Sequence, residues 1–326
     1  VSKFTGSPEI LEGRVKTLHP KIHAGILNKR KSKSHLKDLK KNNFENIDLV
    51  IVNFYPFEKS LKQTKDHNEI IEKIDIGGPA MVRSAAKNYN DVTVITSNEN
   101  YLELIKELKS NNGSTTLEFR KKMSQLAFAE TAYYDSVISN YFNQISNNNF
   151  PQKKTIHGNL IEKLRYGENP HQESAIYSIN DKLKINKIHG KSLSYNNYND
   201  IFAALTISRS LPKNVGTVIV KHSTPCGVSI DKNNLNSFKY AFNSDPISAF
   251  GGIVSCNFKI NKKLAQHLNK IFIEVIIGNG FDLDALKILK SKKNIRIVDA
   301  SNYSFDEHLK FSSIDDTLLI QSEDKK

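Results

Sequence analysis

The chain has 326 residues, of which 38% are hydrophobic and 25% are charged, and its formal net charge is +13. Length and composition suggest a globular protein of about two domains, and no run approaches the roughly 18 apolar residues of a membrane-spanning helix. The positive charge would suit small anionic substrates or nucleic acid, but it is diffuse and lacks sustained interleaving with aromatic residues, so we expect neither a nucleic-acid partner nor a membrane-bound protein.

The first candidate ligand-binding segment runs from Glu12 to Pro20. In an extended segment, residues i and i+2 point the same way. Arg14 and Lys16 can therefore face one anion, and Thr17 can add a hydroxyl group. The alternative for this segment is an ordinary basic surface loop.

Two short apolar runs, 48–53 and 91–96, have the pattern of strands buried on both faces. A helix is expected between them, from Pro79 to Lys87, and this alternation favours a parallel α/β sheet. Ligands of such sheets bind beyond the carboxyl ends of the strands. Tyr55, just after the first run, is therefore a candidate proton donor, with packing under Pro56 as the alternative.

Asp75 and the pair Gly77–Gly78 precede this expected helix. The glycines let backbone N–H groups approach a ligand, and a helix N-terminus favours anions. Asp75 is a candidate acid or base, although a carboxylate here could equally cap the helix. Lys87 lies at the far end of the helix, where the helix dipole also favours a cation.

A long helix is expected after a capping-box pattern at Thr115 and Glu118. Apolar and aromatic residues recur in it at mostly three- or four-residue steps, which predicts core packing for Phe119, Met123, Leu126, Tyr133, Val137 and Tyr141. The helical pattern fades into a polar stretch with a proline at 147–154, which marks a linker. We therefore expect domains at 1–150 and 151–326.

In the second half, Thr217–Val220 predicts a buried strand that leads into Lys221 and His222, followed by a Pro-Cys-Gly turn at 225–227. A histidine beside a lysine can move protons while the lysine stabilises an oxyanion. Cys226 and Cys256 are the only cysteines, too few for a disulfide framework or a four-cysteine zinc site. We expect a reduced, cytoplasmic protein.

Short motifs lie in collinear order across nearly the whole chain. Those in the first half are Phe4-Thr5-Gly6 with Pro8-Glu9, 13–20, 53–57, 74–78 with Arg83, and 85–88. Those in the second half are 165–167, 169–172, 194–197, 221–222, 245–246 and 248–252. Together they resemble the bifunctional purine-biosynthesis family, which joins aminoimidazole-carboxamide ribotide (AICAR) formyltransferase to inosine monophosphate (IMP) cyclohydrolase.

The resemblance implies an α/β protein: a partial methylglyoxal-synthase-like parallel-sheet domain followed by a partial cytidine-deaminase-like α/β domain. It implies transfer of a formyl group from 10-formyltetrahydrofolate, the co-substrate, to the 5-amino group of AICAR. Ring closure of the formylated ribotide (FAICAR) with loss of water then gives IMP. The substrates would be ribonucleotide and folate molecules, the full-length protein a homodimer, and no catalytic metal is implied.

The resemblance also implies roles for individual residues. Ring closure would be carried out by Lys16, Tyr55, Asp75 and Lys87, and nucleotide contacts would come from Arg14, Thr17, Asn53 and Gly77. Formyl transfer would be carried out by Lys221 and His222, and ribotide contacts would come from Arg165, Tyr166, Asn197, Gly251 and Glu274.

The chain departs from the family pattern in several places. Members usually begin upstream of Val1 with a Ser/Thr/Gly-rich phosphate loop and continue far beyond Lys326, so we expect an internal fragment that lacks formyl transfer and has at best weak ring closure. Ser223-Thr224 replaces a usual Thr-Asn, and Gly278-Asn279 replaces a usual Ala-Pro. The alternative function is a nucleotide- or phosphate-binding module that binds the ribotide without turnover.

Overall fold

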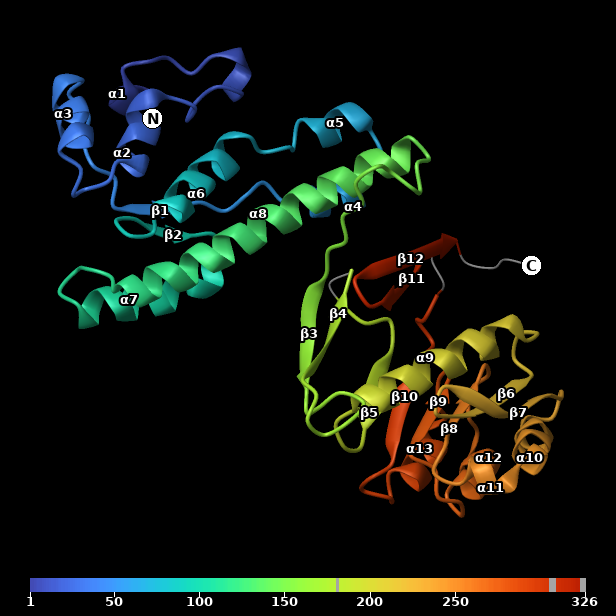
Figure 1. The fold of residues 1–326 in the computed structure, drawn as a ribbon. Coiled ribbons are helices and arrows are strands. Elements are labelled where there is room, and N and C mark those ends of the chain that lie inside the picture. The colour runs from blue at the N-terminus through green and yellow to red at the C-terminus, as the bar shows by residue number, and fades with distance from the viewer. Residues whose placement is uncertain (180–181, 305–308, 323–326) are drawn as a thin grey trace. The chain divides into compact units, whose positions relative to one another are not determined.

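The computed structural model describes residues 1–179, 182–304 and 309–322. The chain forms two compact units, Val1–His157 and Gly158–Lys326 (Figure 1). Residues 151–157 fold back on the first unit, since Asn140 Nδ2 donates to the Thr155 carbonyl oxygen (3.2 Å) and Ser136 Oγ lies 3.0 Å from His157 Nδ1. The domain limit after residue 150 that the sequence suggests separates these partners.

The first unit surrounds a parallel pair of strands, β1 (Leu49–Ile51) and β2 (Thr93–Ile95). Its helices are α1 (Ser2–Thr5), α2 (Pro20–Leu27), α3 (Lys33–Lys41), α4 (Phe57–Gln63), α5 (His67–Ile71), α6 (Gly77–Lys87), α7 (Tyr101–Ser110) and α8 (Leu117–Ile145), with 3-10 turns at Leu11–Gly13 and Asn98–Asn100. The parallel pairing and the intervening helix α6 confirm the predicted α/β arrangement. Among the described helices, none is both long and apolar enough to cross a membrane.

Burial of the two strands differs from the prediction. All residues of β2 are buried, but Leu49 and Ile51 of β1 are 38% and 46% exposed, whereas Val50 is buried. Side chains alternate between the two faces of a strand, and only the Val50 face packs into the core with α2, α6 and α8. The prediction that this first strand is buried on both faces was therefore wrong.

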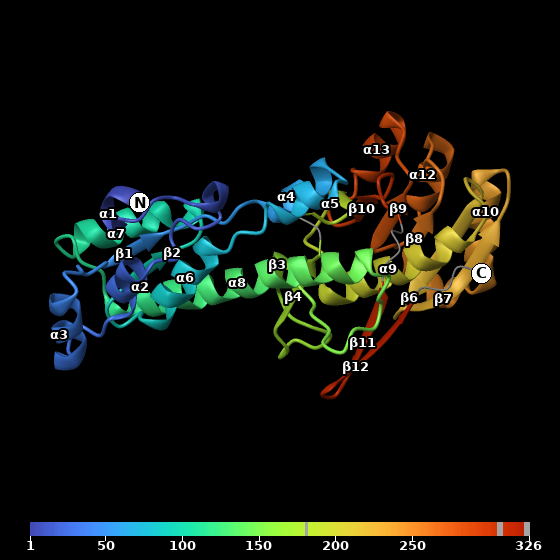
Figure 2. The same cartoon turned by 90° about the horizontal axis from the view of Figure 1, so that it is seen from above.

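Helix α8 spans the first unit, and its two halves pack against different partners (Figures 1 and 2). The N-terminal half contributes Phe119, Met123 and Ala127 to the core around the strands. The C-terminal half contributes Tyr134, Val137 and Tyr141 to a second cluster with α4 and α5. Most of the predicted core stripe is confirmed, but Leu126 is 40% exposed, and Tyr134 is the more buried of the adjacent tyrosines, with Tyr133 only partly buried.

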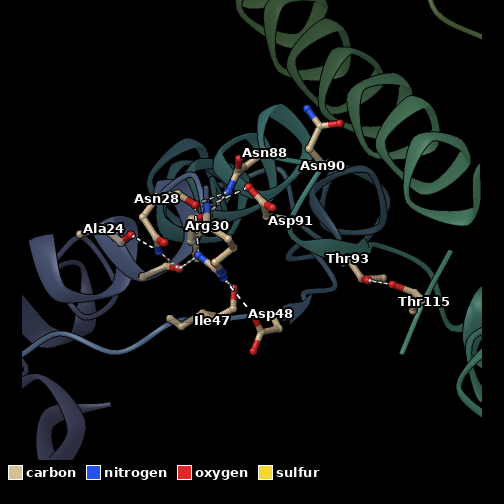
Figure 3. Close-up of polar contacts among 12 residues, drawn as sticks. Ala24, Asn28, Arg30, Ile47, Asp48, Asn88, Asn90, Asp91, Thr93 and Thr115 are labelled. Atoms are coloured by element: carbon tan, nitrogen blue, oxygen red, sulfur yellow. Dashed lines mark hydrogen bonds and ion pairs between the residues drawn. The ribbon is translucent and has the colours of Figure 1, made fainter. Parts of the chain in front are cut away.

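The cap of α8 is one residue later than predicted. Thr116, not Thr115, is the N-cap, and its hydroxyl oxygen accepts from the Phe119 N–H (3.2 Å). The Thr115 hydroxyl lies instead 2.8 Å from that of Thr93 at the start of β2 (Figure 3). The adjacent threonines therefore have different roles, because Thr116 caps α8 and Thr115 contacts the start of β2.

A hydrogen-bonded network lies at the amino ends of β1 and β2 (Figure 3). The Arg30 guanidinium donates to the Ile47 carbonyl oxygen (2.9 Å) and to Asp48 Oδ1 (3.0 Å), next to β1. The Arg30 N–H donates to Asp91 Oδ2 (3.2 Å), close to β2. Asn88, which follows α6, donates to the Asn28 carbonyl oxygen (2.9 Å). The C-terminal end of α6 is thereby fixed near the amino ends of the strands.

The second unit is built on a six-stranded sheet of order β5-β10-β9-β8-β6-β7. Its strands are β5 (Asn186–His189), β6 (Gly216–Lys221), β7 (Thr224–Ile230), β8 (Ile253–Cys256), β9 (Val275–Gly278) and β10 (Arg296–Asp299). Strands β8, β9 and β10 are parallel, while β5, β6 and β7 each run antiparallel to their neighbours. Two hairpins, β3 (Asn159–Leu164) with β4 (Ser174–Ser178) and β11 (Leu309–Ile314) with β12 (Thr317–Ser322), complete the described strands.

Helices cover both faces of this sheet. Val218 and Val220 of β6 pack in the cluster that contains α9 (Tyr195–Ser210), whereas Ile219 packs in the cluster of the opposite face. The opposite face is covered by α10 (Asn234–Ser244), α12 (Lys262–Leu268) and α13 (Leu283–Leu289), and α11 (Pro246–Ala249) precedes β8. The strand predicted at 217–220 is thus confirmed as a buried strand in a three-layer arrangement (Figure 1).

The predicted turn at 225–227 was wrong, because these residues lie within β7. The chain instead reverses at His222 and Ser223, whose φ angles are 53° and 58°. Strand β7 is at the edge of the sheet, where the missing N–H of Pro225 is tolerated. Gly227 allows close packing, since a Cβ atom there would lie 1.9 Å from the Ala241 carbonyl oxygen of α10.

The two cysteines lie in different surroundings. Cys256 of β8 is buried, and burial raises the pKa of its thiol to about 12. Cys226 of β7 is half-buried and its thiol donates to the Ile219 carbonyl oxygen (3.5 Å). Burial also raises the pKa of Cys226. The structure records both as free thiols.

Candidate functional sites

The first candidate site lies at the carboxyl ends of β1 and β2. Asn53 follows β1, and its Nδ2 donates to the Thr96 carbonyl oxygen (3.2 Å) just beyond β2. Asn53 Oδ1 accepts from the Tyr101 hydroxyl (2.9 Å). Tyr55, two residues further along, is 57% exposed. The Asn53 amide is therefore fixed in place, while the Tyr55 side chain is accessible to a ligand.

Thr17 lies against the N-terminus of α6. A Cβ atom on Gly77 would lie 2.2 Å from Thr17 Oγ1, so this close approach requires glycine. The contact brings the segment that carries Arg14 and Lys16 to a helix end where backbone N–H groups favour anions. The structure therefore unites two motifs that are 60 residues apart in the sequence.

Asp75 precedes the same helix and stabilises its first turn. Its Oδ1 accepts from the Gly78 N–H (2.9 Å), which is the capping role considered as an alternative. The Asp75 N–H donates to the hydroxyl of Tyr134 in α8 (2.8 Å). Both the side chain and the backbone of Asp75 are thus fixed by neighbours.

The two cations of the first segment are paired with carboxylates at the surface. Arg14 forms an ion pair with Glu72, and Lys16 Nζ lies 2.9 Å from Glu9 Oε2. The hydrogen bond to Arg14 lowers the pKa of Glu72. Exposed ion pairs contribute little to stability, so an anionic ligand could displace either carboxylate.

Lys87 is separated from the other ring-closing candidates. It is the last residue of α6, about 15 Å along the helix axis from Gly77 at roughly 1.5 Å per residue. It is also adjacent to Asn88 in the network at the amino ends of the strands (Figure 3). The geometry gathers Asp75, Gly77 and Thr17, and does not bring Lys87 to them.

The second candidate site lies where central strands of the six-stranded sheet end. It is formed by the carboxyl end of β6 and the amino ends of β8, β9 and β10. Lys221 is the last residue of β6, and its Nζ donates to the Phe250 carbonyl oxygen (2.8 Å). The Gly251 N–H donates to the Phe272 carbonyl oxygen (2.9 Å), two residues before Glu274. Three predicted site residues are thus brought to one edge by three adjacent strands.

His222 is exposed in the turn after β6. Positive φ angles at both central residues are typical of a type I′ hairpin turn, which usually contains Asn-Gly. Here Asp200 of α9 holds the turn, since its Oδ1 accepts from the Ser223 N–H (2.6 Å). Disfavoured backbone conformations of this kind are frequent at functional sites.

Asn197 connects α9 to Glu274. Together with Ser194 it forms the capping box of α9, and its Nδ2 donates to Glu274 Oε2 (3.1 Å). Arg296, the first residue of β10, lies 3.6 Å from the same carboxylate oxygen. Asn197 and Glu274 are expected from the family motifs, but Arg296 is not, and the pairing of β9 with β10 brings it next to Glu274.

The loop after β3 reaches the start of α9. Asn196 Nδ2 donates to the Glu168 carbonyl oxygen (3.3 Å). In the same loop, the Arg165 guanidinium lies over the Tyr166 ring, 5.5 Å from its centroid. The contact from Asn196 therefore brings the loop of Arg165 and Tyr166 to the helix that carries Asn197.

A cavity of about 720 Å³ opens beside Glu274. Its lining contains five cationic residues and one carboxylate, and consists of Lys191, Lys270, Ile271, Phe272, Ile273, Glu274, Lys292, Lys293, Asn294, Ile295 and Arg296. The cations suit a ligand with more than one negative charge. The sequence feature that could have indicated this cavity is the pair Lys292–Lys293, which lies just before β10. Among the described residues, no group of three His, Cys, Asp or Glu side chains could hold a metal ion.

Comparison with known proteins covers nearly the entire chain. The family model described as AICARFT/IMPCHase bienzyme matches residues 85–326, and that of the MGS-like domain matches residues 1–80. The chain is 43% identical to the bifunctional purine biosynthesis protein PurH of Thermoanaerobacter sp. (strain X514), over 100% of this chain and 64% of that protein. It is 44% identical to PurH of Listeria welshimeri, over 99% of this chain and 64% of that protein.

PurH of Persephonella marina is 45% identical over 93% of this chain and 60% of that protein. The chain therefore spans less than two thirds of the length of these relatives. Among solved structures, the crystal structure of ForH is 32% identical, with a TM-score of 0.38, over 43% of this chain and 74% of that chain.

Proposed function

We propose, because the chain belongs to the AICARFT/IMPCHase bienzyme family, that it acts in the last two steps of IMP synthesis. In this proposal the first unit carries ring closure of FAICAR. The second unit contributes residues to the site that transfers a formyl group from 10-formyltetrahydrofolate to AICAR. The protein would be a cytoplasmic homodimer that acts on these small molecules, without nucleic acid or a resident metal.

Ring closure forms a bond between the carboxamide nitrogen of FAICAR and its formyl carbon, after which water leaves. The carboxamide nitrogen and the formamido nitrogen each lose one proton, and the formyl oxygen gains two protons and leaves as water. Asp75 is the proposed base, and Tyr55 and Lys16 are the proposed donors to the oxygen. Arg14, Thr17, Asn53 and Gly77 are the proposed nucleotide contacts. The proposal for Lys87 rests on the family motif alone.

Formyl transfer joins the 5-amino nitrogen of AICAR to the formyl carbon and breaks the bond of that carbon to the folate nitrogen. His222 would take the amine proton, the departing folate nitrogen would gain one proton, and Lys221 would stabilise the negative charge on the formyl oxygen. Arg165, Tyr166, Asn197, Gly251 and Glu274 are the proposed ribotide contacts.

The observation that carries the proposal is the convergence of distant residues at one sheet edge. Lys221 ends β6, Gly251 and Glu274 lie just before β8 and β9, and Asn197 contacts Glu274 directly. The cationic lining beside Glu274 further supports a substrate that carries phosphate or several carboxylates.

Absorbance-monitored ring closure of FAICAR tests the first half of the proposal. Lys16→Ala is compared with Lys122→Ala, another exposed lysine that is ion-paired with a glutamate in the first unit. We expect turnover to fall by about 10²–10⁴-fold in Lys16→Ala and to persist in Lys122→Ala. Equal turnover in both would contradict the role of Lys16. Ribotide binding without turnover in the wild-type chain would favour a binding module.

A further inference from the structure

Tyr134, in the C-terminal half of α8, contacts both loops that carry proposed ring-closing residues of the first unit. Its side chain is buried, with 7% exposure. One loop holds Tyr55 after β1, and the other holds Asp75 before α6. Neither the sequence motifs nor the predicted core stripe singled out this residue.

The hydroxyl of Tyr134 is bound to the Asp75 loop twice. It accepts from the Asp75 N–H (2.8 Å) and donates to the Lys73 carbonyl oxygen (3.2 Å). Burial raises the pKa of Tyr134, so the hydroxyl keeps the proton that it donates. A single phenol oxygen thereby satisfies two backbone groups on either side of Ile74.

The ring of Tyr134 packs against the Tyr55 loop. Its centroid lies 5.1 Å from that of Phe54 and 6.3 Å from that of Phe57. These two residues flank Tyr55, whose own side chain is 57% exposed. Aromatic contacts at such distances are favourable beyond the area that they bury. The ring therefore fixes the backbone from which Tyr55 projects.

We propose that Tyr134 is a positioning residue for ring closure, which sets Asp75 relative to Tyr55 by joining their two loops. This inference rests on the proposed function. It differs from a purely structural role because it predicts a loss of turnover that exceeds the loss of stability. A small displacement of a catalytic group can cost about 10²-fold in rate.

Tyr134→Phe is the test, because it removes the hydroxyl and retains the ring. Tyr141→Phe is the matched control. Tyr141 is also buried in α8 and packs against Phe57, but its hydroxyl lies 2.8 Å from His67 Nδ1 and not at the Asp75 loop. Steady-state ring closure, thermal unfolding and hydrogen exchange of residues 73–78 are measured on the full 326-residue chain.

We expect Tyr134→Phe to lower kcat by about 10- to 100-fold with little change in KM. Exchange in residues 73–78 should become faster, and the unfolding midpoint should shift no more than in Tyr141→Phe. The proposal is overturned if both variants keep the same kcat, or if exchange of residues 73–78 is unchanged in Tyr134→Phe. It is also overturned if the two variants lose kcat equally.

A wild-type chain without ring closure would count against the proposed function and not, by itself, against the contact between the loops. The exchange measurement then decides. Faster exchange of residues 73–78 in Tyr134→Phe alone supports the positioning role, and equal exchange in both variants refutes it.

Discussion

At His222 and Ser223 the backbone has φ angles of 53° and 58°, a region in which residues with a Cβ atom are disfavoured. The turn is maintained by the bond from the Ser223 N–H to Asp200 (2.6 Å). The Ser223 hydroxyl also donates to the same oxygen, at a longer distance of 3.4 Å. The shorter bond uses the backbone of Ser223, so a change of the Ser223 side chain keeps the main contact that positions the turn.

Ser223→Gly should stabilise the second unit by about 0.5–1 kcal/mol, because glycine adopts positive φ without steric cost. Urea unfolding followed by hydrogen exchange in β6 and β7 measures the effect. Ser244→Gly, at the last residue of α10, is the control and should be neutral or destabilising. A less stable Ser223→Gly variant would show that the serine side chain matters more than the backbone angle.

His23 provides a pH-dependent prediction. Its Nδ1 lies 3.1 Å from Ser84 Oγ, its Nε2 is buried without a hydrogen-bond partner, and burial lowers its pKa. In the unfolded chain the pKa of His23 is about 6.5. As the pH falls, His23 therefore binds a proton in the unfolded chain before it does so in the folded protein. The contribution of His23 to stability is constant above that pH and declines below it.

His23→Gln should reduce the loss of unfolding free energy between pH 7.5 and pH 5.5. Denaturant midpoints of the first unit at these two pH values measure the change. The control is His171→Gln, at an exposed histidine of the second unit. An unchanged pH dependence in His23→Gln would mean that other groups cause the acid sensitivity.

At the scale of elements, packing of α10 on β7 depends on the absence of a side chain at Gly227. A Cβ atom there would lie 1.9 Å from the Ala241 carbonyl oxygen. That oxygen belongs to the backbone of α10, which cannot easily move. The neighbouring turn carries Lys221 and His222, so displacement of β7 would reach the candidate site. The packing of α10 on β7 therefore affects both the stability of the second unit and the position of Lys221 and His222.

Gly227→Ala should destabilise the second unit by about 1–3 kcal/mol or more, as overpacking does. Gly280→Ala separates this effect from backbone strain, because Gly280 has a φ of 92° but its nearest Cβ contact would be 3.6 Å away. Urea unfolding of both variants is compared. Gly227 has no positive φ, so a Gly227→Ala variant as stable as the wild type would contradict a steric cause at this position.

Elements with a clear local signal were predicted well, and contacts between elements were not. Helix α6 ends at Lys87 as predicted and β6 is buried, because short-range periodicity and composition determine such features. Tyr134 was missed because Tyr133 fits the same helical pattern, and only tertiary packing distinguishes them. Pro225–Gly227 had the composition of a turn, but an edge strand tolerates proline. Arg296 became relevant only through strand pairing.

At the scale of the whole molecule, the compact units meet in sequence between His157 and Gly158. Residues 151–157 contain no helix or strand, so no periodic pattern assigns them to either unit. Their hydrogen bonds to Ser136 and Asn140 do so. The ring of His157 also lies 5.1 Å from that of Tyr133.

A fragment of residues 1–157 should therefore be more stable than one of residues 1–150. The shorter fragment lacks the partners of two side chains, Ser136 and Asn140, and at about 1 kcal/mol for each side chain the difference should be about 2 kcal/mol. Thermal and urea unfolding of the two fragments measure it. Identical midpoints would indicate that residues 151–157 add nothing to the first unit.

The unequal surroundings of the two thiols offer a chemical reporter for the second unit. The thiolate is the form of cysteine that attacks alkylating reagents, and it is scarce at Cys256 because burial raises the pKa of that thiol to about 12. Cys226 is more accessible and lies four residues after His222 in β7. Labelling of the native protein should therefore begin at Cys226, and its rate should depend on how often β7 separates from β6. Slower labelling in the presence of a ribotide would show that the ribotide occupies the candidate site at Lys221, even in a chain that performs no catalysis.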